Sequence, residues 1–93
     1  MPLFVMYGLD GPRGADIRKE TRPAHLAWIA SLAPRVKVGG PLLAEDGAAP
    51  VGSMIVLEAA DLADAKAVLA EDPYRAAKLW DRIEIRQFNW IAP

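Results

Sequence analysis

The chain contains one histidine, His25, and no cysteine. An imidazole gains and loses a proton near neutral pH, so His25 is the natural candidate for a general base. Trp28 follows three residues later, and packing against an indole favours the neutral, basic form of the ring. The alternative interpretation is that His25 only packs and forms hydrogen bonds at the edge of a helix.

Asp72 is the candidate partner of His25. A carboxylate that accepts a hydrogen bond from an imidazolium stabilises the charged ring. The alternative interpretation is structural, because Asp72-Pro73 has the pattern of an N-cap followed by proline at the first helical position, and such a cap contributes about 1 kcal/mol. The two roles are compatible if one carboxylate oxygen caps a helix and the other faces His25.

Arg22 lies three residues before His25 and could bind an anionic group of a substrate, as could Lys37 or Arg75, although such charges are more often solvated. A metal site would need mainly oxygen ligands, and the carboxylates are scattered along the chain. Gly39-Gly40-Pro41 lacks the Lys-Ser or Lys-Thr and the helix that follow a phosphate-binding loop. We therefore expect no metal, flavin, nicotinamide or other cofactor.

The composition is that of one globular domain spanning residues 1–93, with 53% apolar and 25% charged residues. Eleven basic residues against twelve acidic residues give a formal net charge of −1, so no field of one sign is available to bind nucleic acid. No stretch approaches the ~18 uninterrupted apolar residues of a membrane span. The start of the chain lacks the pattern of a signal peptide. We expect a cytoplasmic protein with no nucleic acid and no membrane among its partners.

The elements that must position these residues alternate between strands and helices. We predict strands at 3–7, at 36–38 resuming at 42–43, at 53–57 and at 83–88, and helices at 16–32, 62–70 and 73–80. Pro23 could divide the first helix into two pieces. Gly39-Gly40-Pro41 interrupts the second strand, and a shift of the apolar phase after Gln87 predicts a bulge in the last strand.

This order predicts an α+β, ferredoxin-like βαββαβ fold, with a four-stranded antiparallel sheet covered by helices on one face. The first strand is apolar on both faces, with Leu3, Val5 and Tyr7 on one side and Phe4 and Met6 on the other. Something must cover the second face. A second copy of the chain, packed sheet to sheet about a two-fold axis, is the economical solution. We therefore expect a homodimer formed through the sheet faces.

Several short motifs resemble those of the YCII-related (YciI-like) family, and the resemblance covers essentially the whole chain. The motifs are Arg22-Pro23-Ala24-His25-Leu26, Gly40-Pro41, Gly52-Ser53 and Asp72-Pro73-Tyr74 with Ala76-Ala77. The resemblance implies a subunit of the dimeric α+β barrel superfamily, in which the sheets of two subunits face one another around a pocket. It also implies a His and Asp pair in that pocket, here His25 and Asp72, with Ser53 and Tyr74 at positions that could line it. The chain departs from the family pattern at Gln87-Phe88, where relatives often have Pro-Phe.

Family members have been linked to dehydrochlorination of a chlorinated hydroxyquinol, and the superfamily includes muconolactone isomerases. The resulting hypothesis is a small-molecule enzyme of lyase, isomerase or dehydrochlorinase type that acts on a cyclic or aromatic-derived substrate. Neutral His25 would abstract a proton, Asp72 would orient the ring and stabilise the imidazolium, and Arg22, Ser53 and Tyr74 would bind the substrate. The alternative is a non-enzymatic homodimeric module that senses or carries a small molecule.

Overall fold

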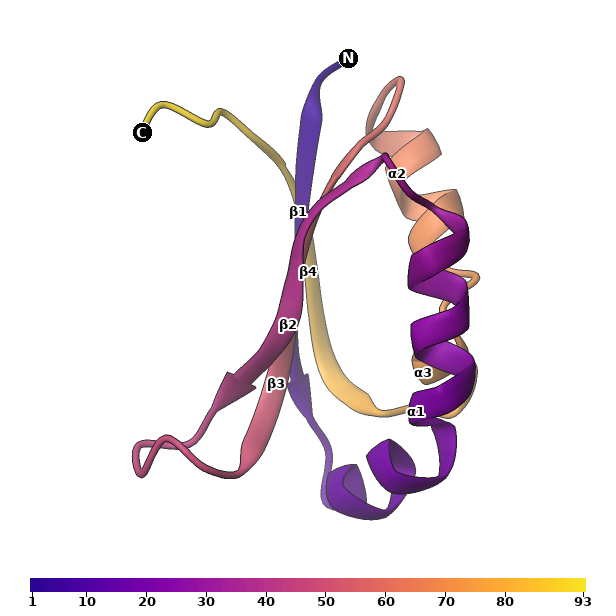
Figure 1. Cartoon of the computed structure of the whole chain (residues 1–93), viewed down its shortest axis with the longest axis vertical. Coiled ribbons are helices and arrows are strands. Elements are labelled where there is room, and N and C mark those ends of the chain that lie inside the picture. The colour runs from indigo at the N-terminus through magenta and orange to yellow at the C-terminus, as the bar shows by residue number, and fades with distance from the viewer.

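The computed structural model describes all residues from 1 to 93, and its elements form two layers (Figure 1). One layer is an antiparallel sheet of four strands in the order β2-β3-β1-β4, and the helices all cover the same face of it. The elements are β1 (Leu3–Asp10), α1 (Gly14–Ser31), β2 (Val36–Leu43), β3 (Pro50–Glu58), α2 (Leu62–Leu69), α3 (Pro73–Ala76) and β4 (Trp80–Phe88). This is the expected ferredoxin-like α+β fold. None of the helices combines the length and the apolar character needed to cross a membrane.

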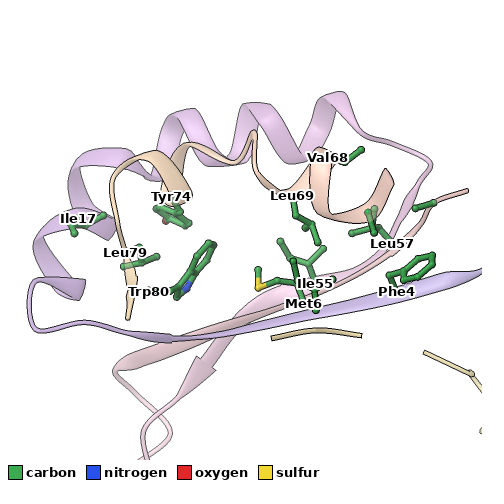
Figure 2. Close-up of a cluster of buried hydrophobic side chains, with 13 residues drawn as sticks. Phe4, Met6, Ile17, Ile55, Leu57, Val68, Leu69, Tyr74, Leu79 and Trp80 are labelled. Carbon is green, nitrogen blue, oxygen red and sulfur yellow. The ribbon is translucent and has the colours of Figure 1, made fainter. Parts of the chain in front are cut away.

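The hydrophobic core lies between the sheet and the helices (Figure 2). β1 contributes Phe4 and Met6, and β3 contributes Ile55 and Leu57. Because side chains of a strand alternate between faces, the neighbours of these residues lie on the face that no helix covers. Tyr7 is 37% exposed there. The predicted division of the first strand into two apolar faces is therefore confirmed.

α1 is assigned as one helix, although Pro23 lies inside it. Pro23 lacks the N–H that would bond the carbonyl of Lys19. Both residues are exposed, so water can satisfy that carbonyl without a break in the helix. Its first turns run at an angle to the longer remainder (Figure 1), in line with the tendency of proline to kink helices. The expected division into two pieces is thus a change of direction within one helix.

The predicted helix over 73–80 is too long, because α3 ends at Ala76 and β4 begins already at Trp80. Lys78 follows with a positive φ of 61°. Its N–H bonds the carbonyl of Arg75, and the N–H of Leu79 bonds the carbonyl of Tyr74, both at 3.1 Å. This pair of hydrogen bonds is a Schellman motif, which terminates a helix.

β2 is one continuous strand, and the predicted interruption at Gly39-Gly40-Pro41 is wrong. β2 lies at the edge of the sheet and has only β3 as a neighbour. An edge strand tolerates proline because the missing N–H need not serve a second neighbouring strand. The register shifts of this pairing occur nearer its two ends, between Val36 and Val38 and between Leu42 and Leu43.

The bulge predicted after Gln87 is also wrong. β4 pairs regularly with β1 as far as Phe88, which lies opposite Leu3. Residues opposite each other in an antiparallel pair share a face of the sheet, so Phe88 lies on the open face with Leu3. The irregularity of this pairing lies at the other end, between Leu9 and Asp10.

Candidate functional site

The N-terminus of α3 brings Asp72 to His25, which lies in the fourth turn of α1. Nδ1 of His25 lies 2.8 Å from Oδ1 of Asp72, across 47 positions in the sequence. The side chain of Asp72 is 1% exposed and that of His25 is 14% exposed. The two candidates selected from the sequence are therefore in hydrogen-bond contact in a largely buried setting.

Asp72 is also the N-cap of α3, with Pro73 in the first turn. Its Oδ1 accepts the backbone N–H of Tyr74 at 2.9 Å, so the cap and the histidine share one oxygen rather than taking one each. Oδ2 is buried and has no hydrogen-bond partner. A buried carboxylate that is incompletely compensated stabilises a positive charge beside it, such as the charge that forms when the imidazole accepts a proton from a substrate.

The partner of Nδ1 determines the tautomer of the neutral ring. A carboxylate only accepts hydrogen bonds, so Nδ1 carries the proton and Nε2 keeps its lone pair. Nε2 of His25 makes no hydrogen bond with the protein, and the residue lines a cavity. The arrangement therefore leaves a basic nitrogen available to a ligand, as a general base requires.

Aromatic rings hold the imidazole in place. The ring of Tyr74 stacks on that of His25 with centroids 4.2 Å apart and planes inclined by 19°, and Trp28 lies at 6.0 Å. Tyr74 is 3% exposed, and this burial raises the pKa of its hydroxyl above the ordinary value of 10.0. Tyr74 is therefore a neutral hydrogen-bond donor at neutral pH.

The cavity beside His25 has a volume of about 320 Å³, at the lower end of the roughly 300 to 1,000 Å³ range of small-molecule sites. The other expected binding residues, Arg22, Ser53 and Tyr74, also line it. Asp72 does not line the cavity and contacts His25 only at Nδ1.

Lys37 and Arg75, the other cations considered from the sequence, do not line this cavity. Lys37 instead pairs with Glu58, Nζ to Oε1 at 2.9 Å. This hydrogen bond and the charge of Lys37 lower the pKa of Glu58.

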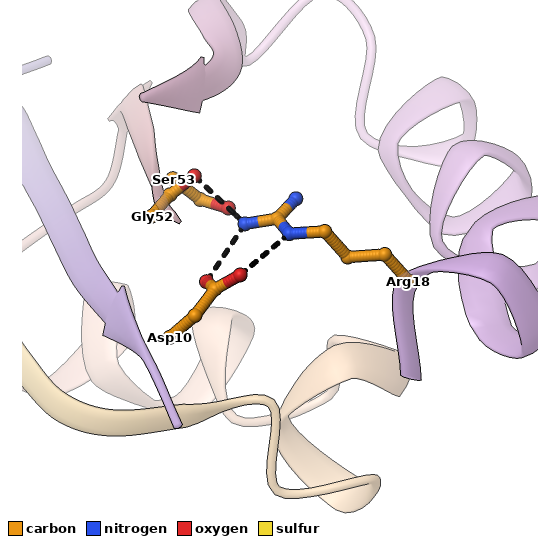
Figure 3. Close-up of polar contacts among 4 residues, drawn as sticks. All are labelled: Asp10, Arg18, Gly52 and Ser53. Carbon is orange, nitrogen blue, oxygen red and sulfur yellow. Dashed lines mark hydrogen bonds and ion pairs between the residues drawn. The ribbon is translucent and has the colours of Figure 1, made fainter. Parts of the chain in front are cut away.

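Arg18 and Asp10 are site residues that the sequence analysis missed (Figure 3). Nε and Nη2 of Arg18 donate to the two carboxylate oxygens of Asp10 at 2.8 and 2.9 Å. Nη2 also donates to the carbonyl of Gly52 at 2.7 Å and to Oγ of Ser53 at 3.0 Å. The guanidinium carbon lies 5.6 Å from the ring centroid of Tyr74. Arg18 thus ties α1 to the ends of β1 and β3.

A sequence signal for Arg18 does exist. Arg18, Arg22 and His25 are spaced by four and three residues, which places them on one face of a helix. Asp10 offered no comparable signal, because its neighbours Gly11 and Pro12 are typical of a turn, whereas Asp10 is the last residue of β1.

Residues 2–89 of the chain match the YCII-related domain. Two proteins named YciI, from Escherichia coli O6:H1 (strain CFT073) and from Shigella flexneri, are each 32% identical to it over 96 residues. Each alignment covers 96% of this chain and 98% of the relative.

Solved structures with the same fold include the 5-chloro-2-hydroxyhydroquinone dehydrochlorinase TftG from Burkholderia phenoliruptrix AC1100, in complex with 2,5-dihydroxybenzoquinone. It is 26% identical, with a TM-score of 0.83 over 94% of this chain and 93% of its own. SnoaB, a cofactor-independent oxygenase from Streptomyces nogalater, is 18% identical, with a TM-score of 0.54 over 94% of this chain and 89% of its own, and shares the fold alone. Together with the match over residues 2–89, the identity to the YciI proteins over nearly the whole chain shows that this protein belongs to the YCII-related family.

Proposed function

We propose that the protein is a small-molecule enzyme that uses His25 and Asp72 for general acid/base chemistry of the lyase or isomerase type on a cyclic, oxygenated substrate. The observation that carries the proposal is the 2.8 Å contact between Nδ1 and Oδ1, which leaves Nε2 free beside a cavity. The similarity to TftG, a dehydrochlorinase, supports this class of chemistry.

In this mechanism Nε2 of His25 accepts a proton from an acidic C–H or O–H group of the bound substrate. The electron pair left on the substrate either shifts within the ring, with the proton returned at another atom, or expels a leaving group such as chloride. The first outcome is isomerisation and the second is elimination with net loss of HCl. Asp72 stabilises the imidazolium that forms. A positioned base of this kind contributes about 10²- to 10⁴-fold in rate.

The working unit in this proposal is a homodimer. The helices cover one face of the sheet only (Figure 1), and the exposed apolar side chains on its strands include Tyr7, Leu9, Val38 and Phe88. Packing two such faces together about a two-fold axis would bury these side chains in both copies at once.

The chain offers a matched pair of aspartates for testing the chemistry. Asp61 caps α2 by accepting the N–H of Asp64 at 2.8 Å, as Asp72 caps α3, but only Asp72 contacts His25. Asparagine preserves an N-cap. At position 72 the shared Oδ1 keeps both N–H groups, but the side chain no longer carries the negative charge that stabilises the imidazolium.

We expect Asp72→Asn to lower kcat by about 10²-fold or more and Asp61→Asn to leave it unchanged. Chloride release from 5-chloro-2-hydroxyhydroquinone is the first assay, followed by a panel of chlorinated hydroxyquinols and muconolactones. Equal kinetics for the two variants would contradict the role of the pair. Binding of panel compounds by the wild-type protein without any turnover would overturn the enzyme proposal in favour of a carrier or sensor.

A further inference from the structure

A second groove, separate from the His25 cavity, lies beside β4 and has a volume of about 310 Å³. The helices α2 and α3 and the strand β4 supply all of its lining residues, which are Lys66, Arg75, Ile83, Glu84, Ile85 and Arg86. Ile83 and Ile85 pack into the core on the helix side of the sheet. A dimer formed through the opposite, open face therefore leaves this groove accessible, and a ligand bound there is independent of the chemistry proposed at His25.

The groove has an excess of positive charge that the protein does not neutralise. Lys66 and Arg75 are exposed and take part in no ion pair. Glu84 is the only carboxylate that lines the groove, and it already pairs with Arg86, Oε1 to Nη2 at 2.9 Å. The chain as a whole has a formal net charge of −1, so this excess does not follow from composition. Two unpaired cations beside one groove favour a ligand with negative charge.

The backbone of β4 offers hydrogen-bonding groups at the same place, because β4 is an edge strand with β1 as its one neighbour. In an antiparallel pair, every second residue exchanges both backbone hydrogen bonds with its partner. The N–H of Ala59 bonds the carbonyl of Pro2 at 3.2 Å, so the even-numbered residues of β1 bond β3 and the odd-numbered ones bond β4. The odd-numbered residues of β1 lie opposite even-numbered residues of β4. Ile83, Ile85 and Gln87 therefore direct their N–H and C=O groups to the free edge.

A side-chain contact supports this direction. Nη1 of Arg86 donates to the carbonyl of Ile85 at 3.2 Å, which places that carbonyl on the side of β4 away from β1. The contact covers one acceptor of the edge and leaves the N–H groups without a neighbouring strand. An unpaired edge of this kind is a template for pairing with another chain.

We propose that β4 and this groove bind an extended segment of a partner protein that has acidic side chains at alternate positions and adds to the sheet as a further strand. Backbone hydrogen bonds to Ile83, Ile85 and Gln87 hold the segment. Residues directly opposite each other share a face of the sheet, so the residues that make these bonds direct their side chains to the helix side. Their carboxylates reach Lys66 and Arg75 there, and the side chains between them lie on the open face.

A second copy of this chain fits the edge less well. Two-fold pairing of β4 with itself would gather Lys66 and Arg75 of both copies around one pair of strands. These cations have no ion-pair partners within a single chain, and their mutual repulsion opposes such an assembly. The charge of the groove thus favours an acidic partner over self-association.

The test uses a hexapeptide of alternating glutamate and valine, with fluorescein at its N-terminus and an amide at its C-terminus. A hexapeptide of alternating lysine and valine is the control for charge. Two further forms of the acidic peptide carry N-methyl groups, one on its glutamates and one on its valines. An N-methyl group removes a backbone donor without changing the charge, so these two forms separate strand addition from ionic attraction. Fluorescence anisotropy gives the dissociation constants.

We expect the acidic peptide to bind at least about tenfold more tightly than the lysine peptide. N-methylation of the glutamates, whose N–H groups face β4, should abolish binding, whereas N-methylation of the valines should leave it nearly unchanged. The double variant Lys66→Gln/Arg75→Gln should bind the acidic peptide about tenfold more weakly. Arg13→Gln removes an exposed charge that does not line the groove and should bind like the wild-type protein.

A matched pair of variants at position 87 tests the backbone of the protein. Gln87→Pro removes one N–H that faces the free edge, where an edge strand tolerates proline. It should weaken binding by about three- to tenfold, whereas Gln87→Ala, which keeps the N–H, should bind like the wild-type protein.

Equal binding of the two N-methylated peptides, or no preference for the acidic peptide, would overturn the proposal, and neither result requires a variant that folds. A further outcome would assign the edge to a second copy of the chain. In that case Gln87→Pro would have a lower mass than the wild-type protein in light scattering after gel filtration, and Gln87→Ala would not.

Discussion

A single oxygen atom, Oδ1 of Asp72, has both a structural role and a role in the proposed chemistry. It accepts the N–H that begins α3 and the N–H of the imidazole. The orientation of His25 is therefore coupled to the position of α3, and a displacement of that short helix would turn the ring. The stacked ring of Tyr74, two residues into the same turn, reinforces this coupling.

Tyr74 gives the site a measurable dependence on pH. Burial raises the pKa of its hydroxyl above 10.0, so the folded protein holds this proton at a pH where the unfolded chain releases it. The contribution to stability is complete below pH 10 and is lost as the pH rises beyond that value. We expect the free energy of unfolding, measured by urea titration, to fall as the pH rises above 10 in the wild-type protein and to fall less steeply in Tyr74→Phe.

Tyr7→Phe is the control for this experiment, since the chain contains two tyrosines and this variant keeps Tyr74. It should retain the alkaline fall in stability. A fall of the same steepness in Tyr74→Phe would show that other groups cause it.

At the scale of elements, α1 is the common support of the site because Arg18, Arg22 and His25 all lie on it. β1 and β3 supply the hydrogen-bond partners of Arg18. These two strands approach each other closely at Gly8 and Gly52. A Cβ added at Gly52 would lie 2.5 Å from the carbonyl oxygen of Gly8. This close approach requires glycine at position 52, and it brings Ser53 and Asp10 within reach of Arg18.

The end of α3 shows why some boundaries were predicted wrongly. A helix C-terminus is usually recognised by glycine, which adopts a positive φ without strain. Here Lys78 occupies that conformation, with φ 61°, so the sequence carries no stop signal before Trp80. The order of strands and helices along the chain and the cap at Asp72, in contrast, were predicted correctly because proline, aspartate and the alternation of apolar residues did mark them.

Lys78→Gly should stabilise the protein. The left-handed conformation costs a residue with a Cβ about 1 to 2 kcal/mol, and the greater freedom of glycine in the unfolded chain offsets about half of that. Lys78 is exposed, so few contacts are lost. We expect the free energy of unfolding in urea to rise by about 0.5 to 1 kcal/mol, with Lys78→Ala close to the wild-type value as the matched control. A lower stability for Lys78→Gly would contradict the Schellman ending of α3.

For the whole molecule, the sequence predicted the two-layer architecture and five residues that the fold brings together around the cavity, but not Arg18 or its partners. The five are His25, Asp72, Arg22, Ser53 and Tyr74. Alternation along strands and helix periodicity show which faces meet. They do not show which side chains from different elements converge at one point. Arg18 was missed for that reason, because its partners Asp10, Gly52 and Ser53 lie on two other elements.

The open face of the sheet leads to the last prediction, which concerns association. Tyr7 lies in β1, one of the two central strands, and its side chain is 37% exposed in a single chain, so a lysine is tolerated there by the isolated subunit. In a two-fold dimer the same change places two like charges in a desolvated interface, where each costs several kcal/mol. Light scattering after gel filtration should give twice the mass of one chain for the wild-type protein and the mass of one chain for Tyr7→Lys.

Ala30→Lys adds the same charge on the exposed side of α1 and should remain dimeric. A monomeric wild-type protein, or a Tyr7→Lys variant that stays dimeric, would show that the sheet faces are not the contact. Because the His25 cavity lies between α1 and the covered side of the sheet, a folded Tyr7→Lys monomer should still bind those compounds of the hydroxyquinol and muconolactone panel that the wild-type protein binds. Association and ligand binding can thus be measured separately on the same variant.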